Sequence, residues 1–259
     1  MKSIKKRLPF YKDYKRLKRM IKDYPQVVSQ RDQTYEKLYM LMEQAGQITF
    51  GSSDWLTMTE LKYGGYVTNV PRHAISDQDK RNQKISTGGD RMSAFYHNYA
   101  PRYAEYLQPL VSHSRRVVLA EIGILRGTGL AIWSDLFPTG RIIGMDIDLV
   151  NTESNMPNLK SRGAFKNNNI ELHKFDQFKD DDPTVSNILK GDKIDIVIDD
   201  GVHLDETIIK SYQATKNHLA DDFVYIIEDN KTVHSYFAKL NPQLNVDYSN
   251  RMTILTPKK

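Results

Sequence analysis

The stretch Val117–Asp148, VVLAEIGILRGTGLAIWSDLFPTGRIIGMDID, decides the fold. It opens with the apolar run Val117–Ile122, which only Glu121 interrupts, and this pattern is typical of a strand buried on both faces. Three glycines follow the run: Gly123, Gly127 and Gly129. Because glycine lacks a Cβ, they allow the backbone to turn tightly and to approach a ligand closely.

The second half of this stretch predicts a helix and another strand. Leu130, Trp133 and Phe137 fall on one face of the helix, and Pro138 with the following glycine closes it. Ile142–Met145 is the next strand, and Asp146 stands at its end. Two parallel strands joined by a helix form a crevice at their carboxyl ends, where nucleotide-like ligands bind. An acidic residue there can accept hydrogen bonds from a ribose diol.

The rest of the chain alternates strands with helices. Further strands are expected at Ile170–Phe175, Ile194–Ile198 and Phe223–Ile227, followed by a hairpin of Leu244–Tyr248 and Met252–Thr256. Helices are expected at Gly89–Leu110, Val185–Leu189, Glu206–Leu219 and Lys231–Leu240. This order predicts an α/β fold, Rossmann-like, with a seven-stranded, mostly parallel sheet, helices on both faces and a helical N-terminal extension.

The N-terminal region differs in composition from the sheet region. We expect residues 1–86 to form a helical auxiliary region and residues 87–259 to form the sheet domain. Ten of the 37 Lys and Arg residues but only one acidic residue lie in Met1–Lys22, so this segment carries +9 and the remainder −4 of the net +5. Lys2–Tyr24 reads as a basic helix with an apolar stripe, and Val27–Gln44 as a second helix.

Three roles stay open for the basic helix: packing on a neighbouring subunit, lying on an anionic membrane surface, or contacting nucleic acid. Packing on a neighbouring subunit is the favoured role, and binding to a membrane surface is the second choice. No nucleic-acid partner is expected. The polar segment Pro71–Gly89 is read as a plain surface loop rather than an active-site lid.

Composition excludes several classes of chemistry. The chain has no cysteine, which rules out disulfides, zinc–thiolate sites and thiol catalysis. A metal must therefore be held by Asp, Glu or His, a donor set that suits hard ions such as Mg²⁺. No apolar run is long enough to cross a bilayer, and no apolar core follows the basic start as in a signal peptide. We expect a cytoplasmic protein.

Acidic residues follow nearly every predicted strand: Asp146, Asp176, the pair Asp199 and Asp200, and the pair Glu228 and Asp229. The carboxyl ends of parallel strands meet at one edge of the sheet, so these side chains are expected close together. Crowded carboxylates repel one another unless positive charge lies among them. A divalent cation between Asp200, Glu228 and Asp229 resolves the repulsion, while the alternative is that one acid of each pair caps the following helix. His203 is near enough in sequence to face the same ion and act as a general base.

Four segments resemble the class I S-adenosylmethionine-dependent methyltransferases: EIGILRGTG at 121–129, RIIGMDID at 141–148, IDIVIDDGVH at 194–203 and YIIEDN at 225–230. The combination is similar to the metal-dependent sugar O-methyltransferases of the macrocin and mycinamicin type. The lead-in GGDRMSAFYHNYAPRY at 88–103 also resembles that family, and the resemblance spans about Thr87–Asp229. Arg91 stands where the family usually has lysine, and Val202 where serine is common.

The resemblance implies a role for each matched residue. Glu121 and Gly123 would line the methionine end of S-adenosylmethionine, and Asp146 would bind its ribose. Further cofactor contacts are implied for Asp148, Asp176 near the adenine, Asp199 and Tyr99, with His97 and Tyr103 approaching the site from the N-terminal side. Asp200, Glu228 and Asp229 would bind Mg²⁺ or another hard divalent cation, and His203, aided by Asp200, would take the proton from a sugar hydroxyl.

The expected function is therefore a Mg²⁺-dependent O-methyltransferase that acts on a sugar hydroxyl of a glycan, a glycolipid or a glycosylated natural product, for example in polysaccharide biosynthesis. Two alternatives stay open. One is a catechol-type small-molecule O-methyltransferase or a hydroxylase-like relative with iron. The other is a non-catalytic nucleotide- or membrane-binding module. Residues 1–24 add an expected peripheral contact with the inner membrane surface, and a homo-oligomer is also left open.

Overall fold

The computed structural model describes residues 34, 37–38, 40–42, 44–64, 90–94, 96–111 and 116–258. The chain divides into two compact units, one of Met1–Gln47 with Tyr66–Ser86 and one of Ile48–Gly65 with Thr87–Lys259. In the first unit, the described residues between 34 and 44 are helical, in agreement with the second predicted helix. The basic segment Lys2–Tyr24 and the loop Pro71–Gly89 lie outside the described residues.

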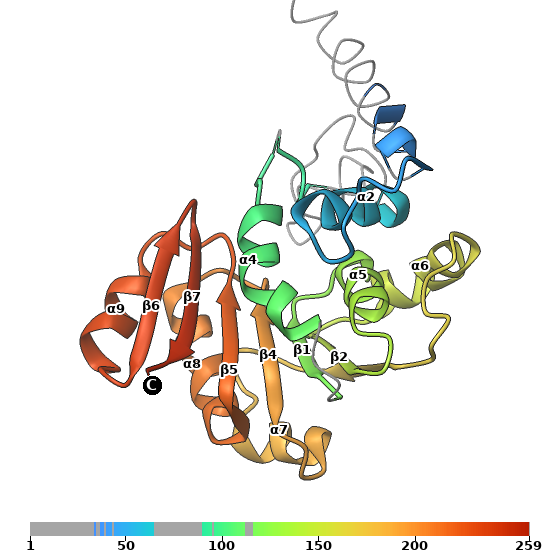
Figure 1. The fold of residues 1–259 in the computed structure, drawn as a ribbon. Coiled ribbons are helices and arrows are strands. Elements are labelled where there is room, and N and C mark those ends of the chain that lie inside the picture. Colours follow the sequence, from blue (N-terminus) through green and yellow to red (C-terminus); the bar gives the residue numbers. More distant parts are fainter. Residues whose placement is uncertain are drawn as a thin grey trace, which may run out of the picture. The chain divides into compact units, whose positions relative to one another are not determined.

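The second unit is built on a seven-stranded sheet (Figure 1). Its strands are β1 Val118–Ile122, β2 Arg141–Asp146, β3 Ile170–Lys174, β4 Ile194–Asp199, β5 Leu219–Ile227, β6 Leu244–Ser249 and β7 Met252–Pro257. They lie in the order β3-β2-β1-β4-β5-β7-β6; the first five are parallel, and the hairpin of β6 and β7 is antiparallel. The predicted Rossmann-like sheet with its terminal hairpin is therefore confirmed.

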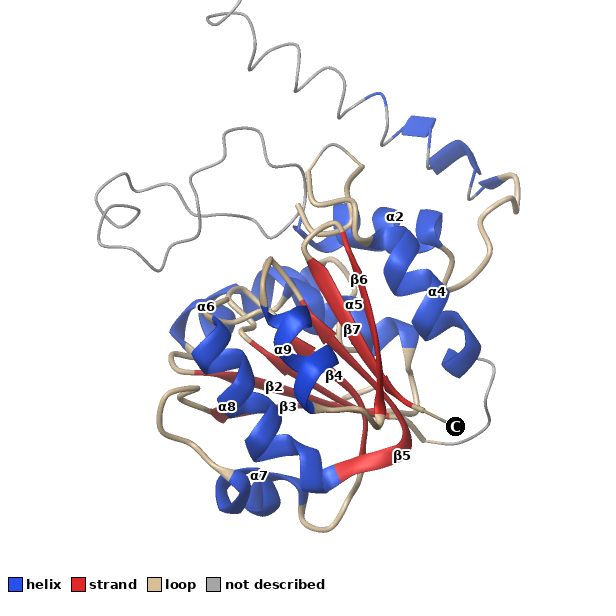
Figure 2. Cartoon of the chain, turned by 90° about the vertical axis from the view of Figure 1, so that its left-hand side faces the viewer, coloured by secondary structure: helices blue, strands red, loops and turns tan. Residues whose placement is uncertain are grey.

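Helices cover both faces of this sheet. They are α2 Ser53–Gly64, α4 Ala100–Val111, α5 Thr128–Leu136, α6 Val150–Ser161, α7 Asp182–Leu189, α8 Asp205–Thr215 and α9 Val233–Leu240, with a short 3₁₀ turn, η2, at Lys216–His218. Side chains of α2, α4, α5 and α6 share one core with the sheet, and those of α7, α8 and α9 share the other. Figure 2 shows α4 on one side of the strands and α8 and α9 on the opposite side.

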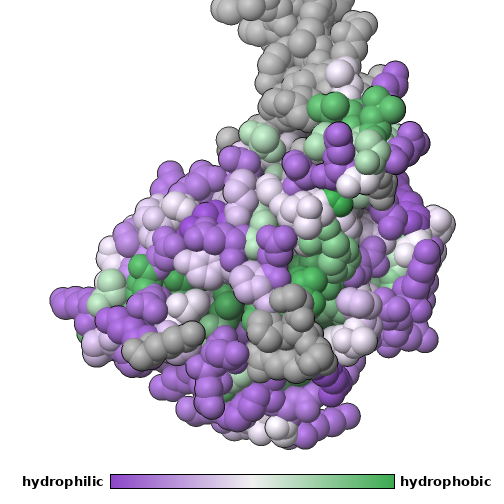
Figure 3. Space-filling view, viewed as in Figure 1, coloured by the Kyte–Doolittle hydropathy of each residue, from purple (hydrophilic) through white to green (hydrophobic). Residues whose placement is uncertain are grey.

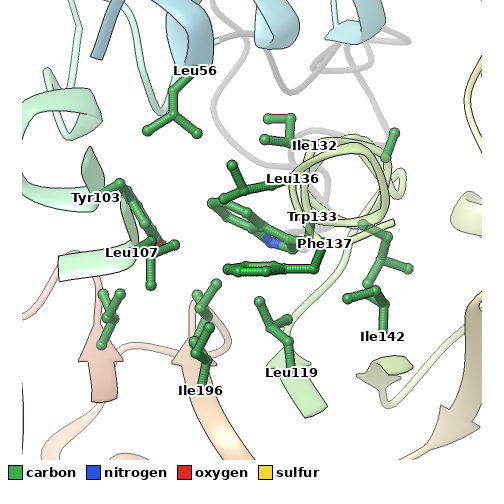
Figure 4. Packing of buried hydrophobic residues seen from close by; sticks show 14 of the residues in the cluster. Leu56, Tyr103, Leu107, Leu119, Ile132, Trp133, Leu136, Phe137, Ile142 and Ile196 are labelled. Carbon is green, nitrogen blue, oxygen red and sulfur yellow. The ribbon is translucent and has the colours of Figure 1, made fainter. Parts of the chain in front are cut away.

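Alternate side chains along each strand point to opposite faces of the sheet and belong to the two cores. In β1, Leu119 belongs to the first core, whereas Val118 and Ala120 belong to the second, as the two-residue period of a strand requires. In the first core, Trp133 and Phe137 fill the space between the helices and the sheet (Figure 4). Burying large aromatic side chains is a major source of stability. The predicted apolar face of α5 is therefore the face that packs on the sheet.

The sequence pattern did not predict two of the helices, α2 and α6. Their buried positions include polar residues, such as Thr57 and Glu60 in α2 and Asn155 in α6. A helix that buries polar side chains leaves no apolar stripe in its sequence, so periodicity does not reveal it. Ile48–Gly65, which lies within the predicted auxiliary region, belongs to the same compact unit as the sheet.

The strand order reverses between β1 and β4, and this reversal places the ends of both strands at the crevice. Gly123 follows β1 with a φ of +84°, and its N–H donates to the Met145 carbonyl over 2.8 Å. A Cβ at Gly123 would lie within 3.0 Å of the Asp200 carbonyl oxygen, a separation that real Cβ atoms essentially never have. Only glycine therefore allows the loops after β1 and β4 to approach so closely.

The surface is largely hydrophilic on the face drawn in Figure 3, in keeping with a mean hydropathy of −0.58. Among the described residues, no helix combines the length and the apolarity that crossing a bilayer requires.

Candidate active site

Four carboxylates gather where β1, β4 and β5 end, and we call them the acidic cluster: Glu121, Asp200, Glu228 and Asp229. Glu121 and Glu228 are only 1% and 3% exposed, whereas Asp200 is partly exposed. Register places the strand ends side by side, since Ile122 pairs with Asp199 and Asp199 with Ile227. The prediction that the acids after these strands share one edge of the sheet is confirmed.

Arg91 provides the positive charge among these carboxylates. Its Nη1 lies 2.7 Å from Glu121 Oε1, its Nη2 2.5 Å from Asp200 Oδ2, and its Nε 3.1 Å from Glu228 Oε1. One guanidinium thus joins acids from three parts of the sheet, a use for which its planar fork of donors is suited. The sequence predicted that crowded carboxylates need a cation but assigned this role to a metal ion alone.

Arg91 does not fully offset the cost of burying these carboxylates. Burial raises the pKa of Glu228 well above its ordinary value, although Arg91 opposes the shift. Burial likewise raises the pKa of Glu121 against the effect of Arg91. Burial alone would lower the pKa of Arg91, but Glu228, Glu121 and Asp200 raise it well above its ordinary value. The site therefore favours either a proton or a further positive group on these carboxylates.

Asp229 faces a different set of partners. Its Oδ1 accepts a hydrogen bond from the Tyr99 hydroxyl over 2.7 Å and lies 3.1 Å from His97 Nδ1 and 3.3 Å from Arg251 Nη2. Although burial opposes the shift, His97 and Tyr99 lower the pKa of Asp229. Hydrogen bonds to Asp229 and Asp90 raise the pKa of His97 to about 10. His97 is therefore a cation that fixes Asp229.

His203 lies on the turn between β4 and α8 in a left-handed conformation, with a φ of +63°. Its Nδ1 is 3.3 Å from the Glu228 carbonyl oxygen, and its Nε2 is 3.8 Å from Asp200 Oδ1. Asp229 also has a positive φ, +53°. Such conformations cost free energy in residues other than glycine and are concentrated at functional sites. The imidazole is thus held beside the acidic cluster with Nε2 on the side of Asp200.

The residues predicted to bind the cofactor fall into two groups. Asp146 lies beside the turn after β1, where its Oδ2 accepts hydrogen bonds from the N–H groups of Ile124 and Leu125 over 2.9 and 3.2 Å. Asp148 is exposed and accepts from the N–H of Val150. These contacts order the loop at the mouth of the crevice.

After β3, Asp176 accepts the Phe178 N–H and pairs with Lys179. Asp199 is buried, and burial raises its pKa to about 6 although a hydrogen bond from Gln177 opposes the shift. The side-chain Oε1 of Gln177 also accepts the N–H of Val202 over 2.9 Å. Gln177, which the sequence reasoning missed, therefore positions the turn that carries Asp200 and His203.

Glu60 is a second residue that the sequence reasoning missed. It lies on α2, is 1% exposed, and accepts the backbone N–H groups of Arg91 and Met92 over 3.0 and 2.8 Å. Burial raises the pKa of Glu60 to about 8, with Asp90 adding to the shift and Arg91 opposing it. Glu60 thus fixes the backbone from which the Arg91 side chain enters the acidic cluster. No sequence motif links it to the site, since the contact joins residues 31 positions apart.

Replacing Glu60 with glutamine is expected to change how stability depends on pH. Because the pKa of Glu60 is raised from 4.5 to about 8, the folded chain keeps a proton that the unfolded chain releases over this range. Stability therefore falls as pH rises from 5 to 8, on the order of 3 kcal/mol for this group. Urea unfolding at both pH values should show that Glu60→Gln loses this fall.

Glu171→Gln is the matched control, because Arg141 lowers the pKa of Glu171 to about 2 and its contribution is lost only below the ordinary pKa of 4.5. An equal slope in the wild type and in Glu60→Gln between pH 5 and 8 would contradict the expectation.

The predicted metal ligands fit a hard divalent cation in part. Asp200 and Glu228 face one cationic group, the Arg91 guanidinium, and carboxylate oxygens are the donors that Mg²⁺ prefers. Asp229 is directed at His97 and Tyr99 instead. Within the described part of the chain, no three carboxylate or imidazole groups are arranged to hold a metal ion. The donor chemistry fits, but Arg91 stands among the donors.

Comparison with known proteins places this site in context. No protein-family model matches the chain. Mycinamicin VI 2''-O-methyltransferase of Micromonospora griseorubida is 27% identical over 145 residues, which cover 54% of this chain and 33% of that protein. The chain thus matches about a third of the length of this curated relative.

Comparison with solved structures shows the same resemblance. The MycE methyltransferase from the mycinamycin biosynthetic pathway, in complex with Mg, SAH and mycinamycin VI, has a TM-score of 0.52 at 16% identity, covering 65% of this chain and 50% of that chain. A crystal form with Mg and SAH has a TM-score of 0.52 at 17% identity, covering 74% and 56%. In sequence and in fold, the chain resembles a class I methyltransferase of the mycinamicin O-methyltransferase type.

Proposed function

We propose that this chain is an S-adenosylmethionine-dependent O-methyltransferase that methylates a sugar hydroxyl, with Mg²⁺ or another hard divalent cation as a second cofactor. The observation that carries the proposal is the acidic cluster beside His203 at the carboxyl edge of a class I methyltransferase sheet. The similar curated enzyme is named as a mycinamicin VI 2''-O-methyltransferase, and the similar solved MycE methyltransferase is in complex with Mg, SAH and mycinamycin VI. The acceptor is a glycan, a glycolipid or a glycosylated natural product.

The proposed cofactor site lies along the ends of β1, β2, β3 and β4, with Tyr99 added from the segment before α4. It uses the matched residues Glu121, Gly123, Asp146, Asp148, Asp176, Asp199 and Tyr99. When bound, S-adenosylmethionine supplies a methyl group on a sulfonium, and a divalent cation lowers the pKa of the hydroxyl that it contacts. The chain itself must hold the acceptor in line with the methyl group and remove its proton.

His203 is the proposed general base. With the Nδ1 proton directed to the Glu228 carbonyl oxygen, Nε2 is left to accept a proton. Asp200, whose Oδ1 is 3.8 Å from Nε2, stabilises the imidazolium that forms. Asp200 therefore has two proposed roles, as a cation ligand and as the partner of the base. General-base assistance of this kind contributes about 10² to 10⁴ to the rate.

Acceptor analogues test this function. Sugars with two adjacent hydroxyls should be methylated in the presence of S-adenosylmethionine and Mg²⁺, and EDTA should abolish the reaction. The matching deoxy sugars, which lack the neighbouring hydroxyl, should react at least about tenfold more slowly because they cannot chelate the cation. Product masses and the position of the methyl group give the readout. Transfer that is insensitive to EDTA, or confined to catechols, would contradict the proposal.

Contact of residues 1–24 with an anionic membrane surface stays a separate prediction, since this segment lies outside the described residues.

A further inference from the structure

The arrangement of Arg91 raises a conflict with the cation that the proposed function requires. The guanidinium contacts Asp200 Oδ2 and Glu228 Oε1, the carboxylates of two of the three predicted metal ligands. Two positive groups that share the same carboxylates at a partly buried site repel one another strongly. Arg91 in this position and a divalent cation on the same carboxylates are therefore opposed.

Glu121 offers the guanidinium a second position. Its Oε1 already accepts from Arg91 Nη1 over 2.7 Å, while its buried Oε2 accepts no close hydrogen bond from the described residues, although the Trp133 side chain is a neighbouring donor. A guanidinium that leaves Asp200 and Glu228 can pair with both oxygens of Glu121, the two-point geometry that arginine and carboxylate prefer. The unpaired oxygen, which is costly to leave buried, would then be satisfied.

Only the side chain of Arg91 needs to move between these positions. Its backbone N–H is fixed by Glu60 over 3.0 Å, and the neighbouring Met92 N–H by the same carboxylate over 2.8 Å. The guanidinium also lies 5.8 Å from the Trp133 ring, a fully buried side chain that limits its path. The base of the side chain is thus held while its end has two sets of acceptors.

We propose that Arg91 and a divalent cation are alternative counter-ions of Asp200 and Glu228, so that cation binding moves the guanidinium fully onto Glu121. The inference rests on the proposed function, because that function supplies the cation. Arg91 pairs with Asp200 and Glu228 before the cation arrives, and it sets how tightly the cation binds.

Manganese binding by the intact chain tests this inference, with free Mn²⁺ measured by electron paramagnetic resonance. Arg91→Lys is the decisive variant, because it keeps the charge but loses the fork that bridges three carboxylates. It should bind Mn²⁺ about tenfold more tightly than the wild type, which corresponds to the loss of one competing charge-assisted contact. Arg91→Met, which also loses the charge, should bind more tightly still.

Arg102→Met separates competition from general electrostatics. Arg102 pairs with Glu105 and Asp247 and, among the described ion pairs, contacts none of the three predicted cation ligands. Competition predicts that its replacement changes Mn²⁺ affinity by less than about threefold, whereas a purely electrostatic effect would make it resemble Arg91→Met. Thermal melts of each variant confirm folding, and Arg91→Lys keeps the test valid where Arg91→Met unfolds.

Binding of S-adenosylhomocysteine (SAH) to the same proteins distinguishes a failure of the Arg91 inference from a failure of the proposed methyltransferase function. If Arg91→Lys binds Mn²⁺ only as tightly as the wild type and still binds SAH, the competition between Arg91 and the cation is refuted. The proposed methyltransferase function is not affected by that result. Absence of Mn²⁺ binding in all variants at millimolar concentration would likewise refute the competition. Failure of the folded wild type to bind SAH would instead refute the proposed function itself.

Discussion

Replacing His203 with asparagine lowers kcat for methyl transfer by about 10² to 10⁴, while the affinity for SAH changes by less than about threefold. The loss follows from the position of the imidazole, whose Nε2 lies 3.8 Å from Asp200 while its Nδ1 faces the Glu228 carbonyl oxygen. Asparagine removes the titratable nitrogen. It is the suitable replacement because it tolerates the left-handed φ of +63° at this position better than alanine does.

His218→Asn is the matched control for this variant. His218 lies directly before β5, at the opposite end of that strand from Glu228, and its Nε2 is 3.2 Å from Asp182. Its replacement should leave kcat within about twofold of the wild type because it is far from the carboxyl edge. Steady-state kinetics and SAH titration of both variants provide the measurement. A kcat for His203→Asn close to that of His218→Asn would remove His203 from the mechanism.

Gly123→Ala is expected to reduce stability by about 3 kcal/mol or more and to abolish SAH binding at micromolar concentration. Two effects add at this position. The φ of +84° is unfavourable for alanine, and the added Cβ would fall within 3.0 Å of the Asp200 carbonyl oxygen. Since the contact is with backbone, the loops after β1 and β4 must separate, and the cofactor site and the acidic cluster separate with them.

Gly191→Ala isolates the second effect. Gly191 also has a positive φ, +94°, but nothing lies within 4 Å of the position that a Cβ would take. Its replacement should cost about 1 kcal/mol from backbone strain and leave SAH binding intact. Urea unfolding of the two variants gives the comparison. If Gly123→Ala costs no more than Gly191→Ala and binds SAH normally, the close approach of the two loops is unimportant for the site.

The strands and the position of the acids could be predicted from the sequence because each depends on local pattern. Buried parallel strands leave mostly apolar runs, such as Val118–Ile122 and Ile194–Ile198, each interrupted by a single acid, and an acid directly after such a run must lie at the carboxyl edge. The hairpin of β6 and β7 is predicted from two short strands joined at Ser249 and Asn250, and the structure extends β6 through Ser249 and turns at Asn250 and Arg251. These features need no knowledge of distant contacts.

The partners of the acids could not be predicted, because they come from parts of the chain that no local pattern links. Arg91 reaches Asp200 across 109 residues, and Tyr99 reaches Asp229 across 130. Crowded carboxylates show that a cation is needed but do not show which one. Glu60 was missed for a related reason, since α2 buries polar side chains and lacks the apolar stripe that reveals a helix.

The departure from the family pattern at Arg91 is therefore informative. A lysine would place one compact charge among the carboxylates, whereas the guanidinium contacts Glu121, Asp200 and Glu228 at once. This difference changes the expected cation affinity without removing any proposed ligand. The Arg91 side chain also links the ends of β1, β4 and β5, and this link supports the geometry of the site before any ligand binds.

Calorimetric titration of the 259-residue chain with SAH tests the central claim most directly. The account predicts one SAH bound per chain, with a dissociation constant between about 1 µM and 1 mM, unchanged in His203→Asn and lost in Gly123→Ala. A folded wild-type chain that shows no binding at millimolar SAH would contradict the claim that the carboxyl edge of this sheet is a methyltransferase site.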